Sequence, residues 1–401
     1  MKRSKALAGM FLFFAFVLMF SGSVFADGAQ EFKNAFADGK FSGEIGSYFE
    51  YKANEASDTN TGWANAYLTF KYETLAWNNL QFGTRFFAHG QLYNEAQNSS
   101  DPFGADVESE FTLPELYLNY GFGDSSNVRA GRFDHKMVSH IDDAQSEGAY
   151  VQFKELENIE LIAGFIKRFA EIDYDDGEDF GRTNDAQDLN SESTFGSGSS
   201  DTLIFLEGKY KPVENLTLNP FFMYHDDYAN VVGLETSFNS QWDKYEIEYG
   251  GSVLYEYINA EIAGSDDANV FAIMPFVKKG PVKLDFCYSK FSDGSALNKP
   301  QWLADINNLV DQENADGLAG SEFFETRIKY SFEKLWLSYA FGIANYDTSS
   351  SVGNGFNDNE FQVGYKVTDS FDVNVRYFIV SYDDIANKDY NKVETLIKFK
   401  F

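Results

Sequence analysis

Charged side chains take every second position in several short segments of this sequence, opposite a series of apolar residues. In 321–332, for example, Glu325, Arg327 and Lys329 share one face of an expected strand. A charged group that faces lipid costs about 2–4 kcal/mol at the middle of a bilayer, so in a membrane barrel this face must line the lumen. Fixed charges on a lumen wall act on the charge of the solutes that pass. The candidate pore-lining residues are Arg85, Glu115, Arg168, Glu235, Glu246, Glu248, Asp285, Glu325, Arg327, Lys329, Glu360 and Arg376.

Two interpretations of these charges stay open. The arginines could form a row that faces an acidic wall and creates a transverse field across the lumen. Alternatively, each charge is a solvated lumen residue without a role in selecting solutes. A related choice concerns Arg129 and Arg132, which lie on opposite faces of one expected strand. The sequence leaves open which of these two arginines points inward.

The connection 136–146 is a candidate constriction loop. If it folds into the barrel, its charged side chains would reach the lumen and narrow it. An ordinary outer loop is the alternative interpretation. In a second connection, the segment 302–313 could form a short amphipathic helix that plugs or rims the mouth. The charged residues of the candidate constriction loop are Lys136, His140, Asp142 and Asp143.

No metal site is expected. The connection 171–201 is rich in carboxylates, the hard oxygen ligands that calcium prefers. It lacks the ligand spacing and the glycine position of an EF-hand loop, so we interpret it as a solvated acidic loop. The acidic residues that raise the question are Asp173, Asp175, Asp176, Glu178 and Asp179.

An enzyme is not expected either. A barrel hydrolase would need a general base beside a nucleophile or an activated water. His225 is followed by Asp226 and Asp227 at the end of an expected strand, where such a site could lie. No serine–histidine pair is visible, and an aspartate beside a histidine is expected by chance in so acidic a chain. Hydrolysis is therefore kept only as a lesser alternative.

A period of two in hydrophobicity runs through almost the whole chain and predicts β-strands. In 391–401, Ile397 and Phe399 alternate with Glu394 and Lys398. Such segments have roughly the 9–11 residues that a tilted strand needs to cross a bilayer. We predict an all-β fold, a transmembrane antiparallel β-barrel of about 18 strands. The expected strands are 41–53, 63–74, 79–92, 111–122, 126–135, 147–154, 159–170, 202–211, 215–225, 229–239, 243–257, 268–279, 281–291, 321–332, 334–346, 359–368, 371–382 and 391–401.

The connections between these segments alternate between short and long. Outer-membrane barrels have short periplasmic turns and long extracellular loops, so the alternation predicts an even number of strands and two periplasmic termini. A large soluble β-sandwich or β-helix would bury its apolar face instead and is the alternative. Aromatic residues near the strand ends favour the membrane, because they resemble interfacial girdles. These aromatic residues are Phe41, Trp63, Tyr72, Phe82, Tyr255, Trp336 and Tyr382.

The composition excludes other classes. The net charge is −30, so the basic footprint of a nucleic-acid-binding protein is missing. Aromatic residues make up 17% of the chain, which argues against a disordered acidic polypeptide. After Ala26 no 18 apolar residues follow one another, so a membrane-spanning helix is not predicted. The single cysteine, Cys287, is expected to face the lumen, within reach of a membrane-impermeant thiol reagent.

The first residues resemble a secretory signal peptide. Lys2, Arg3 and Lys5 precede an apolar run, and 24–26 (VFA) ends in a small residue of the kind found at cleavage sites. A membrane-anchoring helix is the alternative. We predict a cleaved signal peptide at 1–26, a short periplasmic segment at 27–40 and the transmembrane barrel at 41–401.

Stretches spread over most of the chain resemble the OprD-type (Opr) porins, an eighteen-stranded family of outer-membrane proteins. The terminal Phe401, inside a strand of alternating pattern, resembles the assembly signal of such barrels. One loop departs from the family: 136–146 contains Asp142 and Asp143 but lacks the arginine and proline often found there. The stretches that carry the resemblance are 31–46 (EFKNAFADGKFSGEIG), with a short helical lead into the first strand, 128–134 (VRAGRFD), 147–150 (EGAY), 216–230 (LTLNPFFMYHDDYAN) and 299–302 (KPQW).

The resemblance implies an outer-membrane porin through which small hydrophilic solutes and ions diffuse passively, with some charge selectivity and without a cofactor. The expected partners are outer-membrane lipid, lipopolysaccharide, the barrel assembly machinery and the solutes. The oligomeric state stays open between a homotrimer and a monomer. The negative net charge favours cations, because a cleft lined by one sign of charge concentrates counter-ions. A surface-exposed structural barrel or adhesin is the alternative function.

Overall fold

The chain is almost entirely β-strand in the part that its structure describes. The computed structural model describes residues 26–54, 60–94, 110–134, 144–171, 187–188, 202–225, 229–261, 266–294, 319–350, 353–383 and 389–401. Among these residues, no helix has the length and apolar character needed to cross a membrane.

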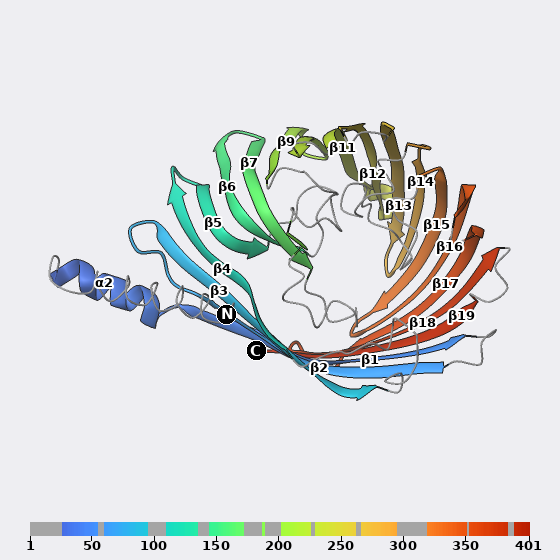
Figure 1. Cartoon of the computed structure of the whole chain (residues 1–401), viewed down its shortest axis with the longest axis horizontal. Helices are drawn as coiled ribbons and strands as arrows, with labels where there is room; N and C mark the ends of the chain where they lie inside the picture. Colours follow the sequence, from blue (N-terminus) through green and yellow to red (C-terminus); the bar gives the residue numbers. More distant parts are fainter. Residues whose placement is uncertain are drawn as a thin grey trace.

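Eighteen long strands form one closed antiparallel barrel (Figure 1). The described residues hold nineteen strands, but β8 (Gln187–Asp188) is only two residues long, and β7 pairs directly with β9, which leaves eighteen in the wall. The long strands are β1 (Lys40–Asn54), β2 (Asn60–Glu73), β3 (Leu80–Asn94), β4 (Glu110–Phe122), β5 (Ser126–Asp134), β6 (Ala144–Leu156), β7 (Ile159–Glu171), β9 (Leu203–Val213), β10 (Leu216–His225), β11 (Ala229–Trp242), β12 (Ile247–Ala260), β13 (Ala268–Lys279), β14 (Val282–Phe291), β15 (Ser321–Phe332), β16 (Leu335–Ser350), β17 (Gly353–Lys366), β18 (Phe371–Asp383) and β19 (Tyr390–Lys400).

The first and last strands close the barrel. β1 pairs with β2 along one edge and with β19 along the other. The terminal residue takes part, because the Gly43 amide donates to the Phe401 carbonyl at 2.9 Å and the Phe401 amide donates back to the Gly43 carbonyl at 3.0 Å. Each of the eighteen segments predicted from the sequence overlaps one long strand, so the prediction of a closed all-β barrel is confirmed.

The two faces of the sheet differ as the alternation predicts. In β12, Leu254, Glu256 and Ile258 are 0–1% exposed and point to the inner face, whereas Tyr255 between them is 50% exposed on the outer face. The same alternation leaves at least one large apolar side chain exposed on the outer face of every long strand of the wall, and β13 to β15 repeat it regularly. An apolar outer surface of this extent calls for a lipid environment.

Three of the aromatic residues assigned to interfacial girdles face inward instead. Trp63 is 4% exposed and packs against inner-face Tyr48 at a ring distance of 4.9 Å. Trp336 lies under the Lys329 ammonium group, and Tyr382 packs against the buried apolar cluster. The other four aromatic residues face outward as predicted, namely Phe41, Tyr72, Phe82 and Tyr255. The period of two separates the faces correctly, but an aromatic residue by itself does not say which face is lipid.

The two ends of the barrel have connections of different length. At one end, here named the turn end, the connections 123–125, 157–158, 280–281 and 333–334 join neighbouring strands. Their tight turns use positive φ angles, 61° at Asn158, 54° at Gly280 and 47° at Glu333. The opposite end, the loop end, carries the long connections, which begin where strands such as β3, β7 and β14 finish.

A helix, α2 (Ala26–Ala37), precedes the barrel at the turn end (Figure 1). Phe32 packs edge-on against Trp77 at 5.1 Å, and Phe36 stacks near Phe82 on the outer face of β3. The Leu75 amide donates to the Ala35 carbonyl at 2.9 Å, which fixes the end of the helix to the turn between β2 and β3. The helical lead implied by the family resemblance is therefore present.

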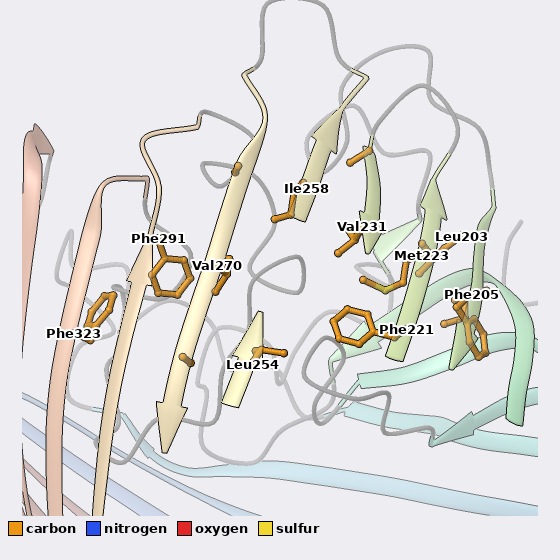
Figure 2. Close-up of a cluster of buried hydrophobic side chains, with 14 of the residues drawn as sticks. Leu203, Phe205, Phe221, Met223, Val231, Leu254, Ile258, Val270, Phe291 and Phe323 are labelled. Atoms are coloured by element: carbon orange, nitrogen blue, oxygen red, sulfur yellow. The ribbon is translucent and has the colours of Figure 1, made fainter. Parts of the chain in front are cut away.

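An apolar cluster lines part of the inner wall, where the sequence predicts a polar lumen (Figure 2). Phe291 and Phe323 meet edge to face at 5.7 Å on β14 and β15. The cluster reaches from β4 to β19 on positions of the inner phase, so an apolar residue there belongs to the interior rather than to lipid. The residues labelled in Figure 2 are Leu203, Phe205, Phe221, Met223, Val231, Leu254, Ile258, Val270, Phe291 and Phe323.

A pH-dependent contact closes the connection between β12 and β13. Asp267 accepts hydrogen bonds from the Tyr257 hydroxyl at 2.6 Å and from the Ala260 amide at 3.0 Å. Both bonds favour the charged carboxylate and therefore lower the pKa of Asp267. The bond from the Tyr257 hydroxyl has the larger effect, and the bond from the Ala260 amide the smaller. The stabilisation is therefore complete above the ordinary aspartate pKa and is lost as the pH falls through the lowered value.

We expect this loss in the hydrogen exchange of the Ala260 amide. Its protection, measured against the intrinsic exchange rate, should be constant near neutral pH and fall only in acid, below about pH 4. In Asp267→Ala the protection should be low throughout the same pH range. Protection that already drops between neutral pH and mild acid would contradict the assignment to Asp267.

Candidate functional site: the inner wall of the barrel

Glu115 lies between two cations on the inner wall of β2 to β4. Its Oε1 is 2.9 Å from Arg85 Nε, and its Oε2 is 3.4 Å from Lys71 Nζ. The carboxylate is 2% exposed, so these ion pairs offset the loss of its hydration. The alternation in the sequence predicts that Arg85 and Glu115 share a face, and the antiparallel register puts them directly opposite one another.

A second network crosses β17, β18 and β19. Arg376 Nη1 is 3.0 Å from Glu394 Oε2, and Arg376 Nε is 3.4 Å from Glu360 Oε1. Lys392 Nζ is 2.7 Å from Glu394 Oε1 and only 2% exposed. Glu394 therefore holds two cations at once. Arg376 and Glu360 are among the candidates from the sequence, whereas Lys392 and Glu394 are not, although their alternate positions in the last strand give the same signal.

On β14 and β15 the candidate residues form one block of charge. Asp285 is in register with Arg327, and Asp285 Oδ1 is 2.6 Å from Lys283 Nζ. Lys329 is in register with Lys283, and its ammonium group lies 4.5 Å from the centre of the Trp336 ring. Glu325, fully buried, is in register with Cys287. All four sequence candidates on these strands share the inner face.

Three acidic candidates were expected on β11 and β12. Glu235 and Glu248 lie on the inner wall, and Glu246 lies in a turn. Glu235 Oε2 accepts a hydrogen bond from the side-chain Nδ2 of Asn219 at 3.1 Å. Glu248 pairs with Lys278 at 3.0 Å near the turn end. Glu246 is not on the wall, because it follows the short helix η3 (Asp243–Tyr245) in the left-handed conformation, with φ 53°. A strand expected to start at 243 in fact starts at Ile247.

The structure settles the orientation of the two arginines of β5. Arg129 lies over the ring of inner-face Tyr117 at 4.3 Å and near Tyr150 at 5.8 Å, so it faces the lumen. Arg132 has the opposite phase and pairs with Glu147 on the outer face, at 3.0 Å. Stacking between two buried aromatic rings holds the Arg129 guanidinium in place. The sequence feature that could have predicted this orientation is a tyrosine in each neighbouring strand, Tyr117 in β4 and Tyr150 in β6.

Carboxylates dominate the buried charge of the inner wall. Among the described residues, eight carboxylates and one lysine are buried, each 6% exposed or less. The ion pairs lie within one strand, as between Lys283 and Asp285, or on strands close together, as between Arg85 and Glu115, so positive and negative groups are interspersed along the described wall. Several of their basic partners are more exposed: Lys71 is 35%, Arg85 25% and Arg376 22% exposed. The buried charged residues are Glu50, Glu115, Glu207, Glu256, Glu325, Asp358, Glu360, Lys392 and Glu394.

Several candidates fall outside the described part of the chain. They include the segment 302–313, the acidic loop 172–186 and the constriction-loop residues Lys136, His140, Asp142 and Asp143. Arg168 is in register with Glu147, and neither its side chain nor that of His225 is among those described. Within the described residues, no group of three or more histidine, cysteine, aspartate or glutamate side chains could hold a metal ion.

Cys287 provides a local test of the inner wall. Its phase is inward, as predicted, but its side chain is 1% exposed, so the expectation that a water-soluble reagent reaches it is wrong. We expect a membrane-impermeant maleimide to leave the thiol unlabelled in the folded barrel and to label it fully after denaturation. Cys287→Ser with Ser289→Cys, which moves the thiol by one inward position, should be equally protected, because Ser289 is also fully buried. Rapid labelling of either protein would contradict this packing.

Comparisons with known proteins agree with this geometry. No protein-family model and no curated protein sequence matches the chain. Solved structures do match. They include OccK9 (OpdG) of Pseudomonas aeruginosa (TM-score 0.73, 12% identity), OccAB2 of Acinetobacter baumannii (0.71, 15%) and OpdQ of P. aeruginosa (0.70, 14%). The matches cover 91–92% of this chain and 99% of each of the others. The chain has the fold of the OprD/Occ outer-membrane channels.

The OprD-type fold explains the placement of the site. An eighteen-stranded barrel is wide enough to leave an aqueous lumen, and its wall positions recur at every second residue. The charged pairs described above therefore join side chains of the same inner face, within one strand or on strands close together in the sheet, such as β3 and β4. The fold implied by the sequence resemblance is confirmed by these structural matches, at sequence identities of 12–15%.

Proposed function

We propose that this protein is an outer-membrane porin that lets small hydrophilic solutes and ions diffuse passively. The observation that carries the proposal is a closed eighteen-stranded barrel with an apolar outer face and ion pairs along its inner wall. Barrels of sixteen to eighteen strands leave an aqueous channel. The loop end would face the exterior and the turn end the periplasm, as in other outer-membrane barrels.

The channel is proposed to prefer cations. The net charge is −30, and eight buried carboxylates face one buried lysine on the described inner wall. A lumen with excess negative charge raises the local concentration of cations. The competing influence is the set of partly exposed basic side chains, such as Lys71, Arg85 and Arg376. The sign of the measured ion selectivity will therefore show whether the carboxylates or the basic side chains dominate the electric field in the lumen.

The test is conductance of the refolded mature protein in a planar bilayer. Stable ohmic steps, with a reversal potential of the cation-selective sign in a salt gradient, are the expected result. Asp285→Asn should shift the reversal potential toward anions, whereas Lys290→Gln, on the outer face of the same strand, should leave it unchanged. A folded barrel without any steps would argue against a porin, and an anion-selective reversal potential would refute the cation preference alone.

The remaining parts of the proposal concern export and partners. Residues 1–26 would be a cleaved signal peptide, 27–40 a periplasmic segment, and the terminal Phe401 a signal for the barrel assembly machinery. Phe401 is 50% exposed on the outer face, where a receptor could contact it. Outer-membrane lipid and lipopolysaccharide would surround the barrel. Neither an enzyme nor an adhesin is supported by a specific observation, and no cofactor is proposed.

A further inference from the structure

A polar pocket of about 670 Å³ opens at the turn end of the barrel, beside the turn that joins β9 to β10 and the adjoining ends of β11 and β12. Its lining includes three residues with side-chain amides, Asn215, Asn239 and Gln241, and two with carboxylates, Glu214 and Glu248. Pockets for small molecules measure roughly 300–1,000 Å³ and are lined mostly by apolar groups. This pocket therefore has the size of a solute site but is lined mainly by hydrogen-bonding residues.

The amides of the pocket belong to the inner face of the wall. Gln241 is in register with inner-face Glu248, so the two side chains point the same way. Asn239 precedes Gln241 by two residues in β11 and has the same phase. The pocket thus lies at the mouth of the lumen, and a solute that crosses the barrel passes it at the turn end.

The wall that rises from the pocket continues the same chemistry. The inner positions of β10 beyond Asn215 are Thr217 and Asn219, and their partners in register on β11 are Ser237 and Glu235. Asn219 is 9% exposed, and its Nδ2 donates to Glu235 Oε2 at 3.1 Å. Its Oδ1 is buried without a hydrogen-bond partner among the described residues. Because an unpaired buried oxygen costs free energy, this atom calls for a donor from a bound molecule.

This section of the wall is short of available charge. Strands β10 and β11 contain no arginine or lysine, in contrast to β14 and β15. Both oxygens of Glu248 accept from Lys278 Nζ, at 3.0 and 3.1 Å, and Glu235 accepts from Asn219. The groups that remain are mostly amides and hydroxyls, which donate and accept hydrogen bonds at once. Sugar hydroxyls also do both, so they match this wall better than an ion does.

We propose that the pocket and the wall above it bind a neutral, hydroxyl-rich solute such as a sugar. We name the inner-face residues Thr217, Asn219, Ser237, Asn239 and Gln241 the amide wall. Asn215 and Asn219 are four residues apart in an extended chain, roughly 13 Å, so a solute of several sugar rings can contact both ends of this section. The inference rests on the proposed porin function and names a class of solute for it.

Calorimetric titration of the mature protein in detergent micelles with raffinose, a neutral trisaccharide, tests the amide wall. The wild type should show saturable binding. Asn239→Ala combined with Gln241→Ala should weaken it about tenfold, through the loss of the hydrogen bonds of two side chains. The matched control is Gln362→Ala, which removes an inner-face amide in register with Arg376 on β18, and it should change the affinity by less than about twofold. Equal affinities of the double variant and the wild type would overturn the proposal.

A second ligand distinguishes a sugar site from a cation site. Ethanolamine carries an ammonium group, which the exposed Glu214 carboxylate could attract. If ethanolamine binds more tightly than raffinose and loses its affinity in Glu214→Gln, the pocket is a cation site and the proposal is overturned. The folding of each variant is read from its heat-dependent gel mobility. Gln241→Glu, which keeps the size of the side chain but removes its donors, replaces the double variant if that fails to fold, and it should also weaken raffinose binding.

Single-channel recording separates the pocket from the porin function. Raffinose on the turn-end side should lower the current through the wild type more than through the double variant. A wild type that binds raffinose but shows no conductance would refute the porin function and leave the pocket intact. A conducting wild type that does not bind raffinose would refute the amide wall alone.

Discussion

Replacing Glu394 by alanine is expected to lower the free energy of unfolding by about 3–5 kcal/mol, the usual cost of removing one partner from a buried ion pair. Glu394 lies 2.7 Å from Lys392 and 3.0 Å from Arg376. Lys392 is 2% exposed, so the substitution leaves a buried ammonium group without this counter-charge. Water that enters to solvate it would have to displace the packing between β18 and β19.

The measurement is equilibrium unfolding in urea from lipid vesicles, with the fluorescence of the tryptophans as the probe. Lys278→Gln is the matched control. Lys278 also pairs with an inner-face glutamate, Glu248, at 3.0 Å, but the two side chains are 42% and 45% exposed. A pair that is this exposed contributes about 0–1 kcal/mol. If Glu394→Ala unfolds at the same urea concentration as the control, the network on β17 to β19 does not stabilise the barrel.

The second large effect is expected at Gly131. Its φ is +123°, a conformation open essentially to glycine alone, and it faces Tyr117 of β4 in register. A Cβ atom there would lie 2.3 Å from the Leu116 carbonyl oxygen and 2.9 Å from the Tyr117 Cα. Both are backbone atoms, so no change of rotamer relieves the contact. Gly131→Ala should therefore separate β4 from β5.

We expect Gly131→Ala to cost on the order of 3 kcal/mol, from the strained backbone conformation together with the steric contact. Because Arg129 is stacked on Tyr117 across the same pair of strands, the variant should also alter single-channel conductance. Gly121→Ala in β4 is the control, since its Cβ would meet nothing nearer than 3.8 Å and it should change stability by less than about 1 kcal/mol. Similar urea midpoints for both variants would show that the Gly131 conformation is not required.

The sequence predicts the strands well because one physical rule governs them. A wall between lipid and water forces alternation, and alternation is visible in segments such as 281–291 and 371–382. Where a strand carries charged residues, the same rule also predicts which side chains face inward. For this reason the sequence correctly assigns Arg85, Asp285 and Arg376 to the inner face. Turns are harder: Glu246 has the correct parity for the wall but belongs to a turn that shortens β12.

Packing inside the barrel could not be read from alternation. Trp63 and Trp336 are typical of an interfacial girdle by residue type, yet they pack against Tyr48 and under Lys329 on the inner face. The apolar cluster of the inner wall has the same cause, because an inward side chain can pack against other side chains as well as face water. Which of Arg129 and Arg132 faces inward depends on the neighbouring strands, and register is a property of the folded sheet.

The closure between β1 and β19 sets the order in which the molecule can fold. Gly43 bonds to Phe401, so contacts at the seam join the two extremes of the barrel sequence. Such non-local contacts form slowly, because the entropy of closing a very long loop must be overcome first. Until β19 arrives, the edge of β1 exposes a row of unpaired amides and carbonyls, which lipid cannot satisfy. Synthesis from the N-terminus therefore produces no stable partial barrel, and the chain must be kept unaggregated until its last residue is available.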